Sequence, residues 1–246
     1  MHLNFYRLTA LTLCLTFGFG IPKARAETPM AFSVEPMQTE MVLPVLNQSF
    51  TLRNLSSSSK RLRVEVLERR QEGDREINRQ TSDLRVLENV LQLPPESAKT
   101  IVVEYRGPKK LKSERAYRLV ISDESLGAGA MESLKLSYRA SIFVRDQAHS
   151  PELVVRSWQP KGGARFEVVL KNQGRVRQAL AGLAFEGLEL TKDSVKILES
   201  GMLLAGAERK LNLEVVDPGQ IKALKQVLGQ SSGATPGLIF QAPAAN

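Results

Sequence analysis

Cysteine and histidine are almost missing from this 246-residue chain, which contains one cysteine and two histidines. The cysteine, Cys14, lies in an N-terminal apolar run that we expect to be removed. The remaining chain would then have no thiol nucleophile, disulfide or thiolate metal ligand. His149 would be its one imidazole, which indicates neither a Ser-His-Asp arrangement nor a histidine metal site. We therefore expect a protein that is not an enzyme and needs no cofactor.

Long hydrophobic runs are also missing. The run over residues 8–21 is shorter than the roughly 20 apolar residues that cross a bilayer, and no later segment approaches that length. It is followed by Ala24-Arg25-Ala26, a small-x-small cleavage site. We expect residues 1–26 to be a cleaved signal peptide, so the mature chain is exported and has no membrane span.

The charge of the chain is moderately basic. Its net charge of +8 falls to about +5 when the three basic residues of the leader are removed. Aromatic residues make up 6% of the sequence, and basic clusters interleaved with aromatics are lacking. This pattern argues against nucleic-acid binding and is compatible with an acidic partner or with a simple contribution to solubility.

Apolar and polar residues alternate along most of the mature chain, which is typical of half-buried strands. Segments rich in serine, proline or glycine separate these runs. About seven short strands with regular turns indicate an immunoglobulin-like sandwich. The alternating runs are residues 50–53, 62–66, 101–105, 117–121 and 134–145.

A polar segment, residues 146–151, interrupts the pattern, and we expect a linker there with a solvated His149. A second β series follows, including a strand over residues 195–198. One short helix is predicted after Asp217-Pro218. The sequence thus predicts an all-β chain of two immunoglobulin-like β-sandwich domains, residues 27–147 and 151–246.

The run over residues 134–145 is about twice the usual strand length. Periodicity alone favours a strand that faces the domain's own core. The alternative is an edge strand that offers its backbone and apolar ladder to another chain, or to a second copy of this one. The side chains on its apolar face are Leu134, Leu136, Tyr138, Ala140, Ile142 and Val144.

Several segments, taken in order, resemble the N-terminal domain of the PapD-like periplasmic chaperones of chaperone–usher pili. The specificity lies in their order, their spacing and the two-domain layout behind a signal peptide. The second domain fits more loosely, through residues 166–172 and 237–240. The matching segments are FSVEP (32–36), FTLRN (50–54), LPPES (93–97), SERAYRL (113–119) and FVR (143–145).

The resemblance implies a periplasmic protein that holds incomplete pilus subunits by donor-strand complementation and delivers them to an outer-membrane usher. It also implies that Glu114 and Arg145 belong to a charged cluster linking the domains. The long strand would supply the apolar ladder that fills the subunit's groove. Its expected members are Leu134, Leu136, Tyr138, Ala140 and Ile142.

This chain departs from the family at the anchor for the subunit's C-terminal carboxylate. The family uses an arginine and a lysine, and the matching positions here are Gln38 and Ser141, which carry no charge. Arg139 is on the same face as Ser141, about 6.6 Å along the strand, and is the best substitute. A solvated strand arginine explains it equally well.

Two further function classes stay open from sequence. The chain could be a periplasmic adaptor with this fold that does not cap pilins, as Gln38 and Ser141 suggest. A hydrolase or carbohydrate-binding protein built on β-sandwiches is the least supported class, because the sequence supplies no cluster of catalytic residues.

Overall fold

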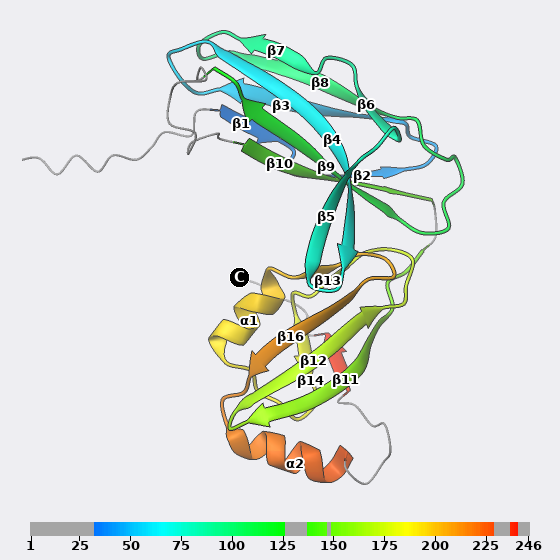
Figure 1. Cartoon of the computed structure of the whole chain (residues 1–246), viewed down its shortest axis with the longest axis vertical. Coiled ribbons are helices and arrows are strands. Elements are labelled where there is room, and N and C mark those ends of the chain that lie inside the picture. The colour runs from blue at the N-terminus through cyan, green and yellow to red at the C-terminus, as the bar shows by residue number, and fades with distance from the viewer. Residues whose placement is uncertain (1–31, 126–136, 147–148, 229–236, 241–246) are drawn as a thin grey trace, which may run out of the picture.

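The computed structural model describes residues 32–125, 137–146, 149–228 and 237–240. The predicted signal peptide therefore lies outside the described residues, as do Leu134 and Leu136. The described chain is mainly β and forms two units, with strands up to Arg145 in the first and from Leu153 in the second (Figure 1). This architecture confirms the predicted fold class.

Two sheets build the first unit. One has the strand order β1-β3-β8-β6, and the other has the order β2-β10-β9-β4-β5, with β7 also paired to β4. The strands are β1 (Phe32–Glu35), β2 (Gln38–Val42), β3 (Asn47–Asn54), β4 (Lys60–Glu72), β5 (Arg75–Gln80), β6 (Leu84–Val86), β7 (Val90–Leu93), β8 (Ala98–Tyr105), β9 (Arg115–Asp123) and β10 (Ser137–Arg145).

The apolar side chains of these strands form one buried core drawn from both sheets. Phe50 of β3, Ile101 of β8 and Tyr117 of β9 are among its members, and each is at most 3% exposed. Burial of a large apolar side chain contributes about 1.5–3 kcal/mol. The period-two alternation of the sequence is therefore the direct cause of the sandwich.

The second unit has a three-stranded sheet of order β11-β12-β16 and two smaller strand pairs, β13–β15 and β14–β17. Its core includes Phe166, Leu211 and Val215, together with Ala116 and Phe143 from the first unit. The apolar contact between the units is therefore continuous with the second core. The strands are β11 (Leu153–Gly162), β12 (Arg165–Asn172), β13 (Gln178–Ala179), β14 (Leu183–Phe185), β15 (Met202–Leu203), β16 (Glu208–Glu214) and β17 (Leu238–Phe240).

Helix α2 (Pro218–Leu228) confirms the helix predicted after Asp217. The strand predicted over residues 195–198 was wrong, because these residues belong to helix α1 (Lys192–Glu199). The Thr191 side chain caps that helix by accepting a hydrogen bond from the Ser194 amide. This capping contact and the acidic Asp193 in the first turn are helix-start signals that the local run of β-branched residues obscured.

A buried asparagine ends one central strand in each unit. Asn54 at the end of β3 donates its side-chain amide to the carbonyls of Ser58, Leu93 and Pro94 at 2.8–3.2 Å. Asn172 at the end of β12 does the same for Val176, Leu203 and Leu204 at 2.7–3.2 Å. Each side chain satisfies loop carbonyls that would otherwise be buried without a donor.

Candidate functional site

Strand β10 has two halves with different pairing. From Ser141 to Arg145 it lies between β9, which is antiparallel, and β2, which is parallel. From Ser137 to Ala140 it pairs with β9 alone among the described residues. The N-terminal half of β10 therefore has one uncovered backbone edge in the described part of the sheet.

The uncovered edge arises because the N-terminal segment changes sheets. Strand β1 pairs with β3 in one sheet, and β2 pairs with β10 in the other. The crossing falls at Pro36 and Met37, and the Met37 carbonyl accepts a hydrogen bond from the Ser141 amide at 2.9 Å. Coverage of β10 by this segment begins at that bond.

The side chains of the expected donor ladder differ in burial. Ala140 and Ile142 are 0% exposed and belong to the first unit's own core, so they cannot fill another protein's groove. This burial corrects their assignment as subunit-binding residues, because both side chains lie on the face of β10 that packs against the first unit's own core. Tyr138 is only partly buried, with its ring 4.5 Å from that of Phe32. The expected ladder thus narrows to Leu134, Leu136 and Tyr138.

The two expected anchor positions meet in the structure. Ser141 of β10 is the register partner of Gln38 on β2 and of Arg118 on β9. Gln38 also lines a cavity between the units. Its side chain offers hydrogen-bonding groups to that cavity but carries no charge. Arg139 is exposed and has no ion pair with any described residue.

Arg118 was missed by the sequence reasoning. Alternation within residues 117–121 puts it on the face of β9 opposite to Tyr117, and the register with β10 then sets it beside Ser141. Its guanidinium lies 2.8 Å from Glu76 of β5, which also pairs with Arg69 of β4. Burial alone would raise the pKa of Glu76, but the hydrogen bonds and charges of the two arginines outweigh it and hold that pKa low.

A chain of four charged side chains links the units on one side. Arg177, from the loop before β13, pairs with both Glu114 and Glu40, and Arg145 pairs with Glu40. Glu114 also accepts a hydrogen bond from the Arg177 amide at 3.0 Å. The predicted members Glu114 and Arg145 therefore do not touch each other directly, and Arg177 and Glu40 connect them.

Two physical features strengthen this charged chain. The Arg177 guanidinium carbon lies 3.8 Å from the centre of the Phe143 ring, a cation–π contact at the apolar junction. The Glu114 side chain is 1% exposed, and burial raises its pKa although Arg177 opposes the shift. No sequence pattern pointed to Arg177 or Glu40, because their partners lie far away along the chain.

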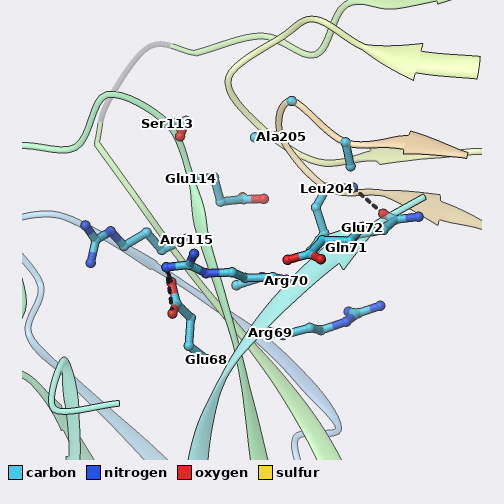
Figure 2. A pocket seen from close by; sticks show the side chains of 13 residues that line it. Glu68, Arg69, Arg70, Gln71, Glu72, Ser113, Glu114, Arg115, Leu204 and Ala205 are labelled. Atoms are coloured by element: carbon cyan, nitrogen blue, oxygen red, sulfur yellow. Dashed lines mark hydrogen bonds and ion pairs between the residues drawn. The ribbon is translucent and has the colours of Figure 1, made fainter. Parts of the chain in front are cut away.

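The β4–β5 hairpin joins the units on another side (Figure 1). The Gln71 side chain accepts a hydrogen bond from the Leu204 amide at 3.2 Å, drawn as a dashed line in Figure 2. Asp74 in the hairpin turn accepts one from the Lys210 amide at 2.9 Å. A polar pocket lies between these elements and is lined by both acidic and basic side chains, among them Glu68, Arg70 and Glu114.

His149 is not the solvated linker residue that the sequence predicted. It lines the cavity between the units, and its Nε2 atom is buried without a hydrogen-bond partner among the described residues. Within the same residues, no group of three or more histidine, cysteine, aspartate or glutamate side chains could hold a metal ion. Neither described helix has the length and hydropathy that a membrane crossing requires.

Comparisons with known proteins give a fold but no close relative. No family model matches the chain, and a search of curated proteins finds no match. Solved structures do match. A chain of the CsuC–CsuE chaperone–tip adhesion subunit pre-assembly complex, from the archaic chaperone–usher Csu pili of Acinetobacter baumannii, has a TM-score of 0.53. It is 14% identical, with 73% of this chain and 89% of that chain covered.

The class 5 fimbriae chaperone CfaA also has a TM-score of 0.53, at 16% identity, with 72% of this chain and 83% of that chain covered. These similarities establish the fold. The chain has the two-domain, all-β fold of these pilus chaperone structures, at 14% and 16% sequence identity.

Proposed function

We propose that this protein is a periplasmic chaperone that holds incomplete pilus subunits by donor-strand complementation and passes them to an outer-membrane usher. The observation that carries the proposal is the edge of β10 over Ser137–Ala140, which no described strand covers, next to a half that is paired on both sides. The fold shared with pilus chaperones supports it. Such a protein works by binding, without catalysis or cofactor.

The physical basis is the addition of a strand. An uncovered edge presents N–H and C=O groups that another strand can pair with, and side chains at alternate positions add specificity. Tyr138 is the described ladder member that is not fully buried. The same edge would also allow self-association of the free protein.

The neutral anchor pair requires a different source of charge if the client is held by its C-terminal carboxylate. Arg139 is available, because it is exposed and unpaired among the described residues. Hydrogen bonds to an ionised carboxylate are about twice as strong as those between neutral groups. Gln38 and Ser141 can donate only neutral ones.

A second candidate function is a periplasmic adaptor with this fold that does not cap pilins. The observation that favours it is the neutral Gln38–Ser141 pair in the position of the family's cations. Substitution of Arg139 by alanine separates the two candidates. Loss of subunit binding in Arg139→Ala would favour the chaperone. If the unmodified protein forms no complex with a subunit, the adaptor is favoured.

The proposal is tested by co-expressing the chain with a candidate pilus subunit of the chaperone–usher class. Leu136→Glu and Tyr138→Glu are expected to abolish co-purification of the subunit, because a charge cannot enter an apolar groove without a partner. Leu87→Glu is the matched control, since Leu87 is 60% exposed and lies in the connection between β6 and β7, away from β10. Equal co-purification by all variants would overturn the proposal.

A further inference from the structure

The connection between β2 and β3 exposes apolar side chains at a position where turns usually carry polar residues. Val45 is 56% exposed and Leu46 is 39% exposed. Both ends of the connection are held by backbone hydrogen bonds, from the Leu43 amide to the Arg145 carbonyl at 3.0 Å and from the Tyr105 amide to the Leu46 carbonyl at 2.6 Å. The exposed side chains therefore stand on a fixed backbone, which lowers the entropy cost of binding a partner.

The connection between β8 and β9 places lysines beside this turn. Its backbone is anchored before them, because the Tyr105 hydroxyl donates a hydrogen bond to the Pro108 carbonyl at 3.1 Å. It is anchored after them by Leu111, whose side chain is buried. Lys109 and Lys110 lie between these two points, are exposed and have no ion pair with any described residue. The connection thus presents unpaired positive charge from anchored positions.

The two connections enclose a cavity of about 380 Å³, which is within the size range of ligand sites. Its lining combines apolar side chains with two lysines and one aspartate. The lining residues are Leu43, Pro44, Leu46, Lys109, Lys110 and Asp146. Lys112, two residues further along the chain, is also exposed and has no ion pair with a described residue. Such a cavity suits a ligand that combines an apolar group with negative charge.

We propose that this cavity binds an acidic segment of a partner protein. One large apolar side chain of the segment fills the cavity, and neighbouring carboxylates of the segment pair with Lys109 and Lys110. A protein segment fits better than a lipid surface, because lipid recognition uses clusters of about four to eight basic side chains. Arg106, the other basic residue of this connection, is already paired with Glu104 at 2.8 Å.

This surface is separate from the edge of β10 that no described strand covers. The β2–β3 connection begins beside Arg145, at the C-terminal end of β10, whereas the uncovered residues are Ser137–Ala140. Arg145 is about 16 Å along the strand from Ala140, the nearest of them. A strand at the edge and an acidic segment at the cavity can therefore be bound at the same time. The inference goes beyond the proposed function and does not depend on it.

The test uses a fluorescent peptide in which a phenylalanine is flanked by aspartates on both sides and both ends are blocked. Its binding to the full mature chain is followed by fluorescence anisotropy. One control peptide has serine in place of phenylalanine, and the other has asparagine in place of every aspartate. We expect the acidic peptide with phenylalanine to bind at least about tenfold more tightly than either control. Added salt should weaken its binding, because the lysines are exposed.

Matched variants locate the binding. Lys109→Gln with Lys110→Gln should weaken it about tenfold. Lys222→Gln with Lys225→Gln removes the same charge from exposed positions of α2 and should change it by less than about twofold. Leu46→Ser should remove the preference for phenylalanine over serine. Lys109→Glu with Lys110→Glu should make the protein prefer a peptide with lysine in place of every aspartate, a gain that a misfolded protein cannot produce.

Each remaining outcome counts against the inference. Absence of binding, or equal weakening by the α2 variants, would overturn it, while subunit co-purification would still test the edge of β10 separately. Amide NMR shifts at Ser137–Ala140 instead of at Leu46 and Lys110 would place the peptide at that edge. Binding to phosphatidylglycerol vesicles that depends on Lys109 and Lys110, without a preference for the acidic peptide with phenylalanine, would assign the surface to lipid.

Discussion

The two halves of β10 have the same alternating sequence pattern but different surroundings. Residues from Ser141 to Arg145 have a strand on each side, bury Ile142 and Val144, and carry Phe143 and Arg145 into the junction between the units. Residues from Ser137 to Ala140 have one strand beside them among the described residues. One strand therefore combines a half that is paired on both sides with a half whose second edge is uncovered among the described residues, where we propose that a partner strand binds.

The largest expected effect comes from the structural half. Ile142→Ala removes a fully buried side chain from a core, which typically costs about 2–5 kcal/mol of unfolding free energy. Denaturant titration of the mature protein measures the loss. Ile239→Ala is the control, because Ile239 is 46% exposed, and it should change the unfolding free energy by less than about 0.5 kcal/mol. Equal effects would contradict the burial assigned to β10.

The next largest effect is expected at the contact between the two units, to which Phe143 and Arg145 of β10 contribute. Glu114→Gln removes the charge opposite Arg177 but keeps an acceptor for the Arg177 amide, so we expect a loss of about 1–3 kcal/mol. Its control, Glu88→Gln, breaks the exposed pair with Lys99 and should cost less than about 1 kcal/mol. Small-angle scattering should also show a wider spread of domain arrangements in Glu114→Gln alone. An unchanged scattering profile would mean that the contacts of the β4–β5 hairpin are enough to hold the two units together.

Tyr138→Ala tests the other half of β10. The side chain is partly buried and its ring packs at a tilt against that of Phe32, so loss of this aromatic contact should cost about 0.5–1.5 kcal/mol in addition to the loss of buried area. Subunit co-purification should fall much more than stability does. If instead the variant is as unstable as Ile142→Ala, the two halves of the strand are not distinct.

The smallest effect concerns acid stability. The folded-state pKa of Glu76 lies below its ordinary value near 4.5, because Arg69 and Arg118 outweigh the opposing effect of burial. The stabilisation is therefore present above that ordinary value and is lost as the pH falls through the lowered pKa. Unfolding free energy measured from pH 6 to pH 3 should fall more steeply in the unmodified chain than in Glu76→Gln. Parallel curves would show that Glu76 is not held by the arginines.

Sequence reasoning predicted the sandwich well because alternation and turn residues act locally. It was wrong for residues 195–198, where the Thr191 cap and the acidic first turn outweigh the β-branched side chains. It also failed for Ala140 and Ile142. Periodicity shows that they share a face with Tyr138, but it does not show that this face packs against the first unit's own core, which depends on how the two sheets are assembled.

The charged residues were partly predictable. Glu114 and Arg145 came from the resemblance, and the structure adds Arg177 and Glu40 between them. Arg118 could have been found by pairing two alternating runs in register. The pairing of both Arg69 and Arg118 with Glu76 could not have been predicted, because it depends on how far β5 extends alongside β4.

The central claim is that the edge of β10 before Ser141 is open and accepts a partner strand. The Ser141 amide points toward the β2 side, so strand alternation directs the Ser137 and Arg139 amides to the same edge. Amide hydrogen exchange by NMR tests this directly. We expect slow exchange at Ser141 and Phe143, fast exchange at Ser137 and Arg139 in the free monomer, and protection of the latter pair when a subunit binds. Slow exchange at Ser137 and Arg139 in the free monomer, or no change on binding, would contradict the claim.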